Sequence, residues 1–247
     1  MNGTMKCIVK TAAGPGNLEL QTRPIPSPGP GEVLAKVHLA AICGTDIHIK
    51  NWAEFAQKRM NPPSIIGHEF CGDIVEAGEG VDPSRIGQLI SAETHIACHK
   101  CALCMDGKAH LCVNTLGLGV HINGCFAEYV VLPSENAMVC SPDVSEQNNA
   151  ILEPLGTVVQ AATKVAAAGK TVAVTGCGPM GSPLSQLIEF SCGLSGVAAA
   201  VIPDGMDIYL AGTLHQGSIL LKGGVLVFIY HGGAYYTRQS LCVQIQT

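Results

Sequence analysis

The stretch Gly67-His-Glu-Phe-Cys-Gly-Asp-Ile-Val-Glu-Ala-Gly-Glu-Gly-Val81 contains two features that decide the fold of this chain. At its start, His68 and Glu69 are groups that bind metals, and they stand beside a glycine that lets the backbone bend tightly around a site. From Gly72 onward it is a short β-rich segment between glycines. The stretch therefore predicts a candidate metal ligand, His68, beside a glycine, followed by a β-rich segment.

Further short β-rich segments lie on either side, at residues 33–39 and 126–132. Residues 24–31 are Pro-Ile-Pro-Ser-Pro-Gly-Pro-Gly, which cannot be helical and must turn the chain into a strand. Residues 146–164 are instead rich in alanine and other helix formers. We therefore predict two domains, residues 1–150 and residues 151–247, and an α/β fold class in which the first domain is β-rich.

Four cysteines follow the spacing Cys98-x2-Cys101-x2-Cys104-x7-Cys112. Thiolates two residues apart bind one metal because a tight turn brings both sulfurs within about 2.3 Å of it. Four of them fill a tetrahedron and leave no open position, so a structural zinc site is predicted. The alternatives are an iron–sulfur cluster, although no proline follows Cys112, and four unrelated core cysteines.

A second constellation combines Cys43, His68 and an acid. Each residue alone is typical of an ordinary buried side chain. Together with Glu153, in Glu-Pro-Leu-Gly, they supply a thiolate, an imidazole and a carboxylate, which leaves a fourth position open as in catalytic zinc sites. One thiolate and one carboxylate balance the charge of Zn²⁺, and the metal then polarises a bound hydroxyl.

Residues 171–175 form a strand-like segment that runs into Gly176-x-Gly178-x-x-Gly181. In this context the glycines permit a tight turn and close approach of a pyrophosphate at a helix N-terminus, which predicts nucleotide binding. A plain tight turn is the alternative. Asp204 is the candidate acid for the ribose, although it comes later in the chain than usual.

The composition excludes several classes of function. Hydrophobic residues make up 47% of the chain, charged residues only 13%, and the net charge is −5. No basic surface is therefore expected to bind nucleic acid or anionic lipid. No secretory leader and no run of eighteen apolar residues is seen, so a cytoplasmic protein without a membrane partner is expected. In that reducing compartment the clustered cysteines are better metal ligands than disulfides, and Cys7, Cys71, Cys140 and Cys242 are expected to be small buried hydrophobes.

These motifs resemble the zinc-dependent medium-chain dehydrogenases. Residues 67–81 fit the signature of that superfamily, and within it residues 42–48, 91–98, 123–130 and 153–156 resemble the L-threonine 3-dehydrogenases. The similarity runs from about residue 5 to residue 181. It implies a GroES-like catalytic domain followed by a partial Rossmann domain, which is a parallel, doubly wound sheet.

The resemblance also implies roles for particular residues. Cys43, His68 and Glu69 would bind the catalytic zinc, and Glu153 would be a fourth ligand or a proton-relay group. Thr45 and His48 would relay the proton of the substrate hydroxyl to solvent, and His95 would help to set the preference for threonine. The implied cofactors are zinc and NAD. The residues that would contact NAD are Gly176, Gly178, Met180, Gly181 and Asp204.

The resemblance implies a small-molecule substrate: L-threonine and NAD⁺ would give 2-amino-3-oxobutanoate and NADH. A related polyol or alcohol dehydrogenase is the alternative. Members of the family assemble through their nucleotide domains, so a homo-oligomer is possible. Gln88 departs from the family, which usually has an acid there, so the loss of a local hydrogen bond is expected.

The family pattern ends after Gly181, and residues 182–247 hold at most half of a full dinucleotide fold. This tail is a nucleotide domain that stops midway, a domain with an internal deletion, or unrelated sequence. Each interpretation predicts uncovered strand edges and apolar surface, for example at residues 225–230. A zinc-binding protein without catalytic activity is therefore the competing hypothesis to a dehydrogenase.

Overall fold

The computed structural model describes residues 3–164 and, beyond them, residues 172–175, 180, 183, 187, 198–200, 225–228 and 243–244. The chain divides into two compact units, Met1–Glu153 and Pro154–Thr247. The first unit is β-rich and the second contains a small parallel sheet, which confirms the predicted fold class. Within the described ranges, no helix is both long and apolar enough to cross a lipid bilayer.

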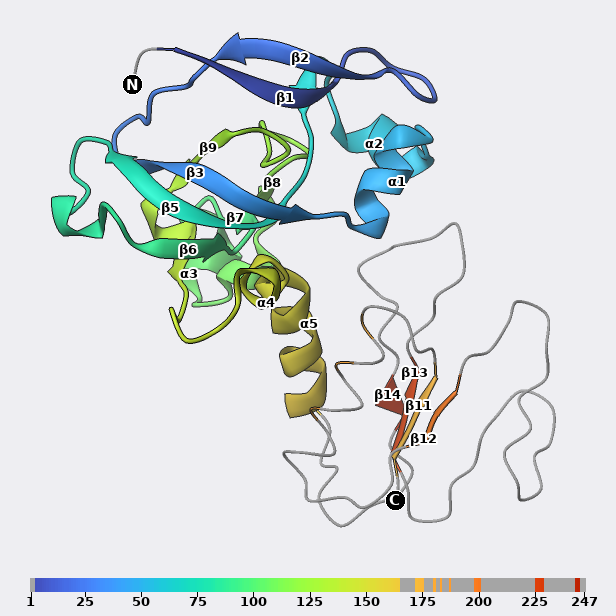
Figure 1. Cartoon of the computed structure of the whole chain (residues 1–247). Coiled ribbons are helices and arrows are strands. Elements are labelled where there is room, and N and C mark those ends of the chain that lie inside the picture. Colours follow the sequence, from blue (N-terminus) through green and yellow to red (C-terminus); the bar gives the residue numbers. More distant parts are fainter. Residues whose placement is uncertain are drawn as a thin grey trace. The chain divides into compact units, whose positions relative to one another are not determined.

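The first unit is built on a five-stranded antiparallel sheet with the strand order β10-β6-β5-β3-β9 (Figure 1). A three-stranded sheet with the order β2-β1-β4 lies beside it, and β7 and β8 form a short pair. The strands are β1 (Thr4–Lys10), β2 (Leu18–Pro24), β3 (Glu32–Ala41), β4 (Ser64–Ile65), β5 (Glu69–Ala77), β6 (Leu89–Ala92), β7 (His95–Ile96), β8 (Leu116–Gly117), β9 (Tyr129–Pro133) and β10 (Ala137–Val139).

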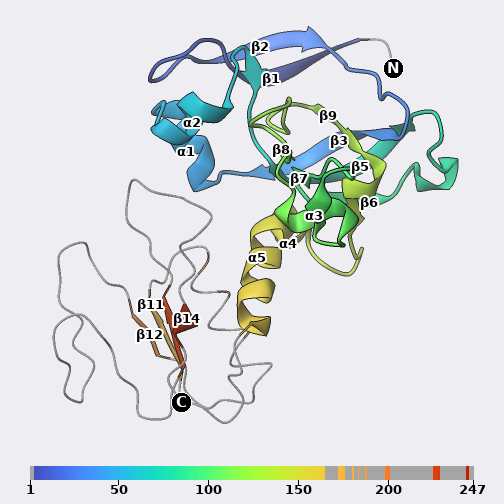
Figure 2. The same ribbon diagram turned by 180° about the vertical axis from the view of Figure 1, so that it is seen from behind.

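Helices occupy the connections between these strands (Figures 1 and 2). The α-helices are α1 (Gly44–Lys50), α2 (Glu54–Arg59), α3 (Ala102–Met105), α4 (Glu146–Ala150) and α5 (Leu152–Thr163), and the 3-10 helices are Pro83–Arg85, Ala109–Leu111 and Ser134–Asn136. The predicted strands at 33–39 and 72–78 correspond to β3 and β5, but β9 begins three residues later than the predicted segment at 126. The predicted helical region at 146–164 is interrupted at Ile151, between α4 and α5.

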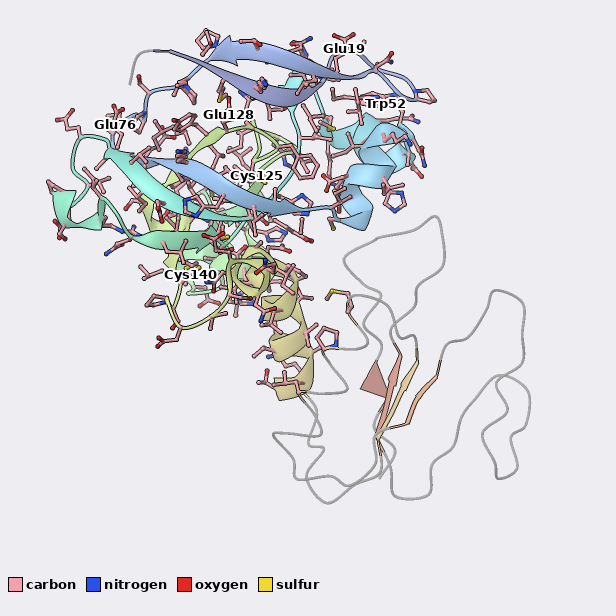
Figure 3. All side chains as sticks on the ribbon, viewed as in Figure 1. Glu19, Trp52, Glu76, Cys125, Glu128 and Cys140 are labelled. Carbon is pink, nitrogen blue, oxygen red and sulfur yellow. The ribbon has the colours of Figure 1, made fainter. Side chains whose placement is uncertain are left out.

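Apolar side chains from all five strands of the large sheet meet in the main core. Val33, Phe70, Ile90 and Leu132 are fully buried there, together with Cys125, whose side chain lies in the interior in Figure 3. Cys7, Cys71 and Cys140 are also buried and have free thiols, as expected for small apolar residues, whereas Cys242 lies outside the described residues. The burial of this side-chain set fixes the register of the sheet, because a shift by one residue would turn each apolar side chain to the opposite face.

Gly67 decides how the chain enters β5 and presents its metal ligands. Its φ is +89°, and a Cβ atom there would lie 2.2 Å from Phe126 Cδ1. Cβ atoms on Gly119 and Gly124 would come within 2.2 and 2.0 Å of the Gly67 carbonyl oxygen. Three backbone segments therefore cross in van der Waals contact immediately before His68, which only glycine permits.

Lys10 is a fully buried cation at the end of β1. Its Nζ donates hydrogen bonds to the carbonyl oxygens of Gly14 and Gly16, and it lies 5.0 Å from the centre of the Trp52 ring, which Figure 3 labels beside α1 and α2. Burial lowers the pKa of this amine. The hydrogen bonds and the aromatic face together replace the water that Lys10 has lost.

We expect Lys10→Ala to lower the free energy of unfolding by about 2 to 4 kcal/mol, because it leaves a cavity and removes the donors of two carbonyl groups. Urea denaturation followed by Trp52 fluorescence measures this loss. Lys6→Ala is the control, since Lys6 is an exposed lysine of the same strand. An equal effect of both substitutions would contradict the structural role of Lys10.

Gln88 keeps the local hydrogen bond that we expected to be lost, so that expectation is wrong. Arg85 Nε donates to Gln88 Oε1 at 3.1 Å. The same guanidinium donates from Nη1 to Ser134 and from Nη2 to the Ala137 carbonyl oxygen at 2.6 Å, and so it links the turn before β6 to β10. An amide oxygen accepts the bond as a carboxylate would, but without the opposite charge.

Gln88→Glu should therefore stabilise the first unit by about 0.5 to 1 kcal/mol, because it adds a charge opposite the half-buried Arg85. A rise in the melting temperature at low salt that shrinks in 1 M salt would be the expected result. In an Arg85→Gln background the same substitution should have no stabilising effect. A gain that persists without Arg85 would contradict this explanation.

In the second unit, three parallel strands form the sheet order β12-β11-β13, and β14 adds an antiparallel edge. The strands are β11 (Val172–Thr175), β12 (Ala198–Ala200), β13 (Val225–Phe228) and β14 (Val243–Gln244). The predicted strand before the glycine turn is β11. The expectation of uncovered strand edges at residues 225–230 is wrong for β13, which pairs with β11 on one side and β14 on the other.

Candidate metal centres and active site

Two groups of side chains in the described part of the chain bring metal-binding atoms together. One consists of the four cysteines Cys98, Cys101, Cys104 and Cys112, and the other of Cys43, His68 and Glu69. Within each group the ligand atoms all lie within 4.8 Å of one another. The spacing is therefore suitable for one ion at each place.

The four cysteines form a lobe at residues 98–112 that contains only α3 and one 3-10 turn. Cys101 Sγ lies 3.5 Å from Cys104 Sγ and 3.9 Å from Cys112 Sγ. Four bonds of about 2.3 Å in a tetrahedron would separate the sulfurs by about 3.8 Å. The donor set thus fits a single zinc ion, whereas a cluster of several iron atoms would hold the sulfurs farther apart.

Hydrogen bonds to sulfur prepare this lobe for a cation. The backbone N–H of Lys100 and the side chain of Asn114 lower the pKa of Cys98 to about 6. The thiolate form of Cys98, which is the form that binds zinc, is thereby favoured, whereas burial raises the pKa of Cys104 to about 12. His99 has a φ of +53°, so the turn between the first two cysteines is left-handed, and its Nε2 lies 2.7 Å from Glu135 Oε1. The His99 side chain thus ties the lobe to the segment before β10.

The second group lies where β3, β5 and α1 meet. Cys43 is the N-cap of α1 and follows β3, His68 follows the Gly67 turn, and Glu69 is the first residue of β5. Residues 41 and 69 are partners in the β3–β5 ladder, so the strand pairing brings the thiol and the carboxylate together. His68 and Glu69 are 8% and 6% exposed.

Burial dominates the electrostatics of this group. It raises the pKa of Cys43 to about 11, although hydrogen bonds from Thr45 oppose the shift. It also raises the pKa of Glu69 and lowers the pKa of His68. Each shift disfavours the charged form, so His68 is a neutral ligand at neutral pH. A buried thiol, imidazole and carboxylate that converge in this way fit a zinc ion, which would stabilise the thiolate and the carboxylate.

Asp46 belongs to this site although the sequence analysis did not include it. It is 3% exposed, its Oδ2 accepts the backbone N–H of Cys43 at 2.9 Å, and its Oδ1 lies 3.8 Å from His68 Nδ1. Neither Asp46 Oδ1 nor His68 Nδ1 has a hydrogen-bond partner. A small movement would join the two atoms and leave His68 Nε2 for a metal, which is the usual arrangement of a carboxylate behind a metal-binding histidine. An acid three residues after Cys43 in a helix N-terminus was the available signal.

We expect Asp46→Asn to weaken zinc binding at this group by about 10- to 100-fold, because the charge that orients His68 is lost. Competition with a fluorescent chelator would measure the affinity. Asp73→Asn is the control, since Asp73 Oδ2 lies 3.2 Å from Nε2 of a different histidine, His38, which is outside both metal groups. Equal losses in the two variants would contradict the role assigned to Asp46.

The structure does not include Glu153 among the converging ligand atoms. Its Oε1 accepts a hydrogen bond from the Thr94 hydroxyl at 3.1 Å, and its charge raises the pKa of both His68 and Glu69. Glu153 therefore lies close to the group in the first unit but outside the three-residue set. Glu153 is therefore better described as a carboxylate next to the metal site than as a direct metal ligand.

The other predicted site residues are distributed as follows. Thr45 and His48 are both half-buried and lie three residues apart on one face of α1. His95 begins β7, and its charge is among the influences that lower the pKa of His68, after burial. Met180 lies in a turn, whereas Gly176, Gly178, Gly181 and Asp204 lie outside the described residues.

The sequence of this chain is similar to those of known dehydrogenases. Residues 29–143 match the model of the alcohol dehydrogenase GroES-like domain. The chain is 47% identical over 181 residues to L-threonine 3-dehydrogenase from Bacillus licheniformis, covering 73% of this chain and 52% of that protein. It is 46% identical over 189 residues to L-threonine 3-dehydrogenase from Caldanaerobacter subterraneus, covering 76% and 54%. The chain spans about half the length of these curated relatives.

The fold of this chain is also similar to the folds of solved dehydrogenase structures. A zinc-binding dehydrogenase from Sinorhizobium meliloti 1021 bound to NADP has a TM-score of 0.73 and 34% identity, covering 80% of this chain and 56% of that one. An alcohol dehydrogenase from Escherichia coli CFT073 complexed with NADH has a TM-score of 0.71 and 35% identity, covering 79% and 56%. At these identities the similarity extends beyond the fold to sequence.

Proposed function

We propose that this chain oxidises L-threonine to 2-amino-3-oxobutanoate with NAD⁺, because residues 29–143 match the alcohol dehydrogenase GroES-like domain and the chain is similar to L-threonine 3-dehydrogenases. The observation that carries the proposal is the convergence of Cys43, His68 and Glu69 within 4.8 Å. A zinc ion bound there supplies a Lewis acid that lowers the pKa of an alcohol hydroxyl. Binding of zinc and NAD, a homo-oligomeric assembly and a cytoplasmic location are parts of the proposal.

The protein residues have separate tasks in this reaction. Cys43, His68 and Glu69 hold the metal, and Asp46 orients His68. Thr45 and His48, which lie on one face of α1, would lead the hydroxyl proton away from the substrate, and NAD⁺ would supply the hydride acceptor. Glu153, whose Oε1 accepts the Thr94 hydroxyl, places a negative charge beside His68 and Glu69.

NADH production by the zinc-loaded full chain tests the proposal. L-threonine, sorbitol and a simple secondary alcohol are supplied in parallel with NAD⁺, and absorbance at the NADH band is followed. Turnover of threonine above the other two is the expected result. Turnover of sorbitol alone would favour the related polyol dehydrogenase and would reject threonine as substrate.

A second candidate is a zinc-binding protein without turnover. It is favoured by the position of every candidate metal ligand in the unit Met1–Glu153, so that metal binding needs no residue of the second unit. Calorimetric titration with NAD⁺ together with metal analysis separates the two functions. Saturable NAD⁺ binding together with two zinc ions per chain supports the dehydrogenase, whereas zinc binding without NAD⁺ binding supports the second candidate.

A further inference from the structure

Thr94 is a buried residue between β6 and β7 whose hydroxyl group contacts a carboxylate next to the metal site. It is 4% exposed, and its Oγ1 donates a hydrogen bond to Glu153 Oε1 at 3.1 Å. Both residues belong to the first unit. A carboxylate oxygen only accepts hydrogen bonds, so the hydroxyl proton of Thr94 is directed at Glu153. The contact therefore holds one oxygen of Glu153 in place.

The backbone around Thr94 is fixed by buried groups. Asn136, which is 6% exposed, donates from Nδ2 to the carbonyl oxygens of Glu93 at 2.7 Å and of His95 at 3.4 Å. The backbone N–H of Leu118, a core residue, donates to the Thr94 carbonyl oxygen at 3.1 Å. Because three consecutive carbonyl groups are anchored, the Thr94 hydroxyl has a defined position, which a residue that orients another side chain requires.

Glu153 carries a charge that acts on two of the three candidate metal ligands. Burial is the main influence on the pKa values of His68 and Glu69, and the charge of Glu153 raises both. A carboxylate this close to a group of three ligands competes with a substrate oxygen for the fourth position of the metal. If Glu153 took that position, the site would have four protein ligands and would be closed, as structural zinc sites are.

The charge of the site makes this competition nearly balanced. The Cys43 thiolate and the Glu69 carboxylate already neutralise Zn²⁺, so a second carboxylate would add a net negative charge to a largely buried site. A single hydrogen bond is then enough to decide where Glu153 lies. A hydrogen bond to a charged acceptor shifts such an equilibrium by about 10- to 100-fold.

We propose that Thr94 is a positioning residue whose hydroxyl holds Glu153 away from the metal and so keeps the fourth position open for the substrate oxygen. This inference rests on the proposed function, because only a reaction at the metal needs an open position. It also explains why Glu153 lies beside the three converging ligands and is not one of them.

Cobalt(II) in place of zinc tests this role in the full chain, since its visible absorption changes with the ligands of the metal. Imidazole is the probe, because it binds an open metal position, whereas the closed four-cysteine site has none. The original protein should give a saturable change in the cobalt spectrum. Thr94→Val, which removes the hydroxyl and keeps the shape of the side chain, should bind imidazole about 10- to 100-fold more weakly.

Further variants separate positioning from a general structural effect. Thr94→Ser keeps the hydroxyl and should bind imidazole nearly as well as the original protein. Adding Glu153→Gln to Thr94→Val should restore the affinity, because the competing carboxylate is gone. Thr115→Val is the control and should have no effect, since the Thr115 hydroxyl donates to the Cys112 carbonyl oxygen at 2.8 Å, outside the reactive group. Unchanged imidazole binding in Thr94→Val, or a loss that Glu153→Gln does not reverse, would overturn the proposal.

The same measurements distinguish the role of Thr94 from the proposed function. If the original protein oxidises L-threonine but Thr94→Val binds imidazole normally, only the role of Thr94 is rejected. If the cobalt responds to imidazole but L-threonine is not oxidised, the proposed function fails and the variant series still decides the role of Thr94. A cobalt spectrum that does not respond in the original protein would mean that the site is closed, which rejects both.

Discussion

Cys43→Ala should lower NADH production at least about a thousandfold and remove one zinc ion per chain, because it deletes the thiolate from a group of only three ligands. A zinc ion held by these residues would supply several kcal/mol of charge stabilisation, and each 1.4 kcal/mol corresponds to a factor of ten in rate. Steady-state kinetics with L-threonine and metal analysis of the same preparation measure the two effects together.

The control is Cys71→Ala, which removes a buried cysteine of β5 that belongs to neither metal group. It should cost about 1 kcal/mol of stability and keep both zinc ions. Cys43→Ala should leave the melting temperature of the metal-free protein nearly unchanged, since Cys43 is only half-buried. Full activity of Cys43→Ala, or loss of both zinc ions, would refute the assignment of Cys43 to a separate reactive site.

Local sequence patterns predicted the four-cysteine group and pointed to Cys43 and His68, whereas Glu69 came from the family resemblance. The spacing of Cys98, Cys101, Cys104 and Cys112 confines four sulfurs to one short lobe, and Gly67 marks a tight turn beside His68. Convergence of Cys43 with Glu69 depends on the β3–β5 register, which no local pattern contains. The choice between Glu69 and Glu153 therefore needed tertiary structure.

The positioning residues were harder to predict, since their roles depend on distances rather than residue types. Asp46 is an ordinary capping acid by sequence, and only its distance of 3.8 Å from His68 Nδ1 reveals a second role. We expected the edge of β13 to be unpaired, and this was wrong because β13 pairs with β14. The two residues of β14, Val243 and Gln244, show no strand pattern in the sequence.

The second large effect is expected from removing the zinc ion of the four-cysteine lobe, residues 98–112. Residues 98–112 contain a single four-residue α-helix and a three-residue 3-10 helix, both far too short to be stable alone. Among the lobe residues only Cys112 is buried, so no apolar core replaces the metal. The free energy of zinc binding, about 10 to 16 kcal/mol in small structural sites, is therefore the main source of order in this lobe.

Cys101→Ser should abolish zinc binding in the lobe, lower the melting temperature by roughly 10 °C, and expose the lobe to trypsin at Lys100 and Lys108. Cleavage should be at least about tenfold faster than in the original protein, whereas fragments from the β-sheet core should appear no sooner, because that core shares no residue with the lobe. Cys140→Ala, a buried cysteine near α4 in Figure 3 and outside both metal groups, serves as the control and should keep both zinc ions and resist trypsin. Resistance of Cys101→Ser to trypsin would mean that packing rather than zinc orders the lobe. The zinc at Cys43 should remain bound in this variant, since the two ligand sets have no residue in common.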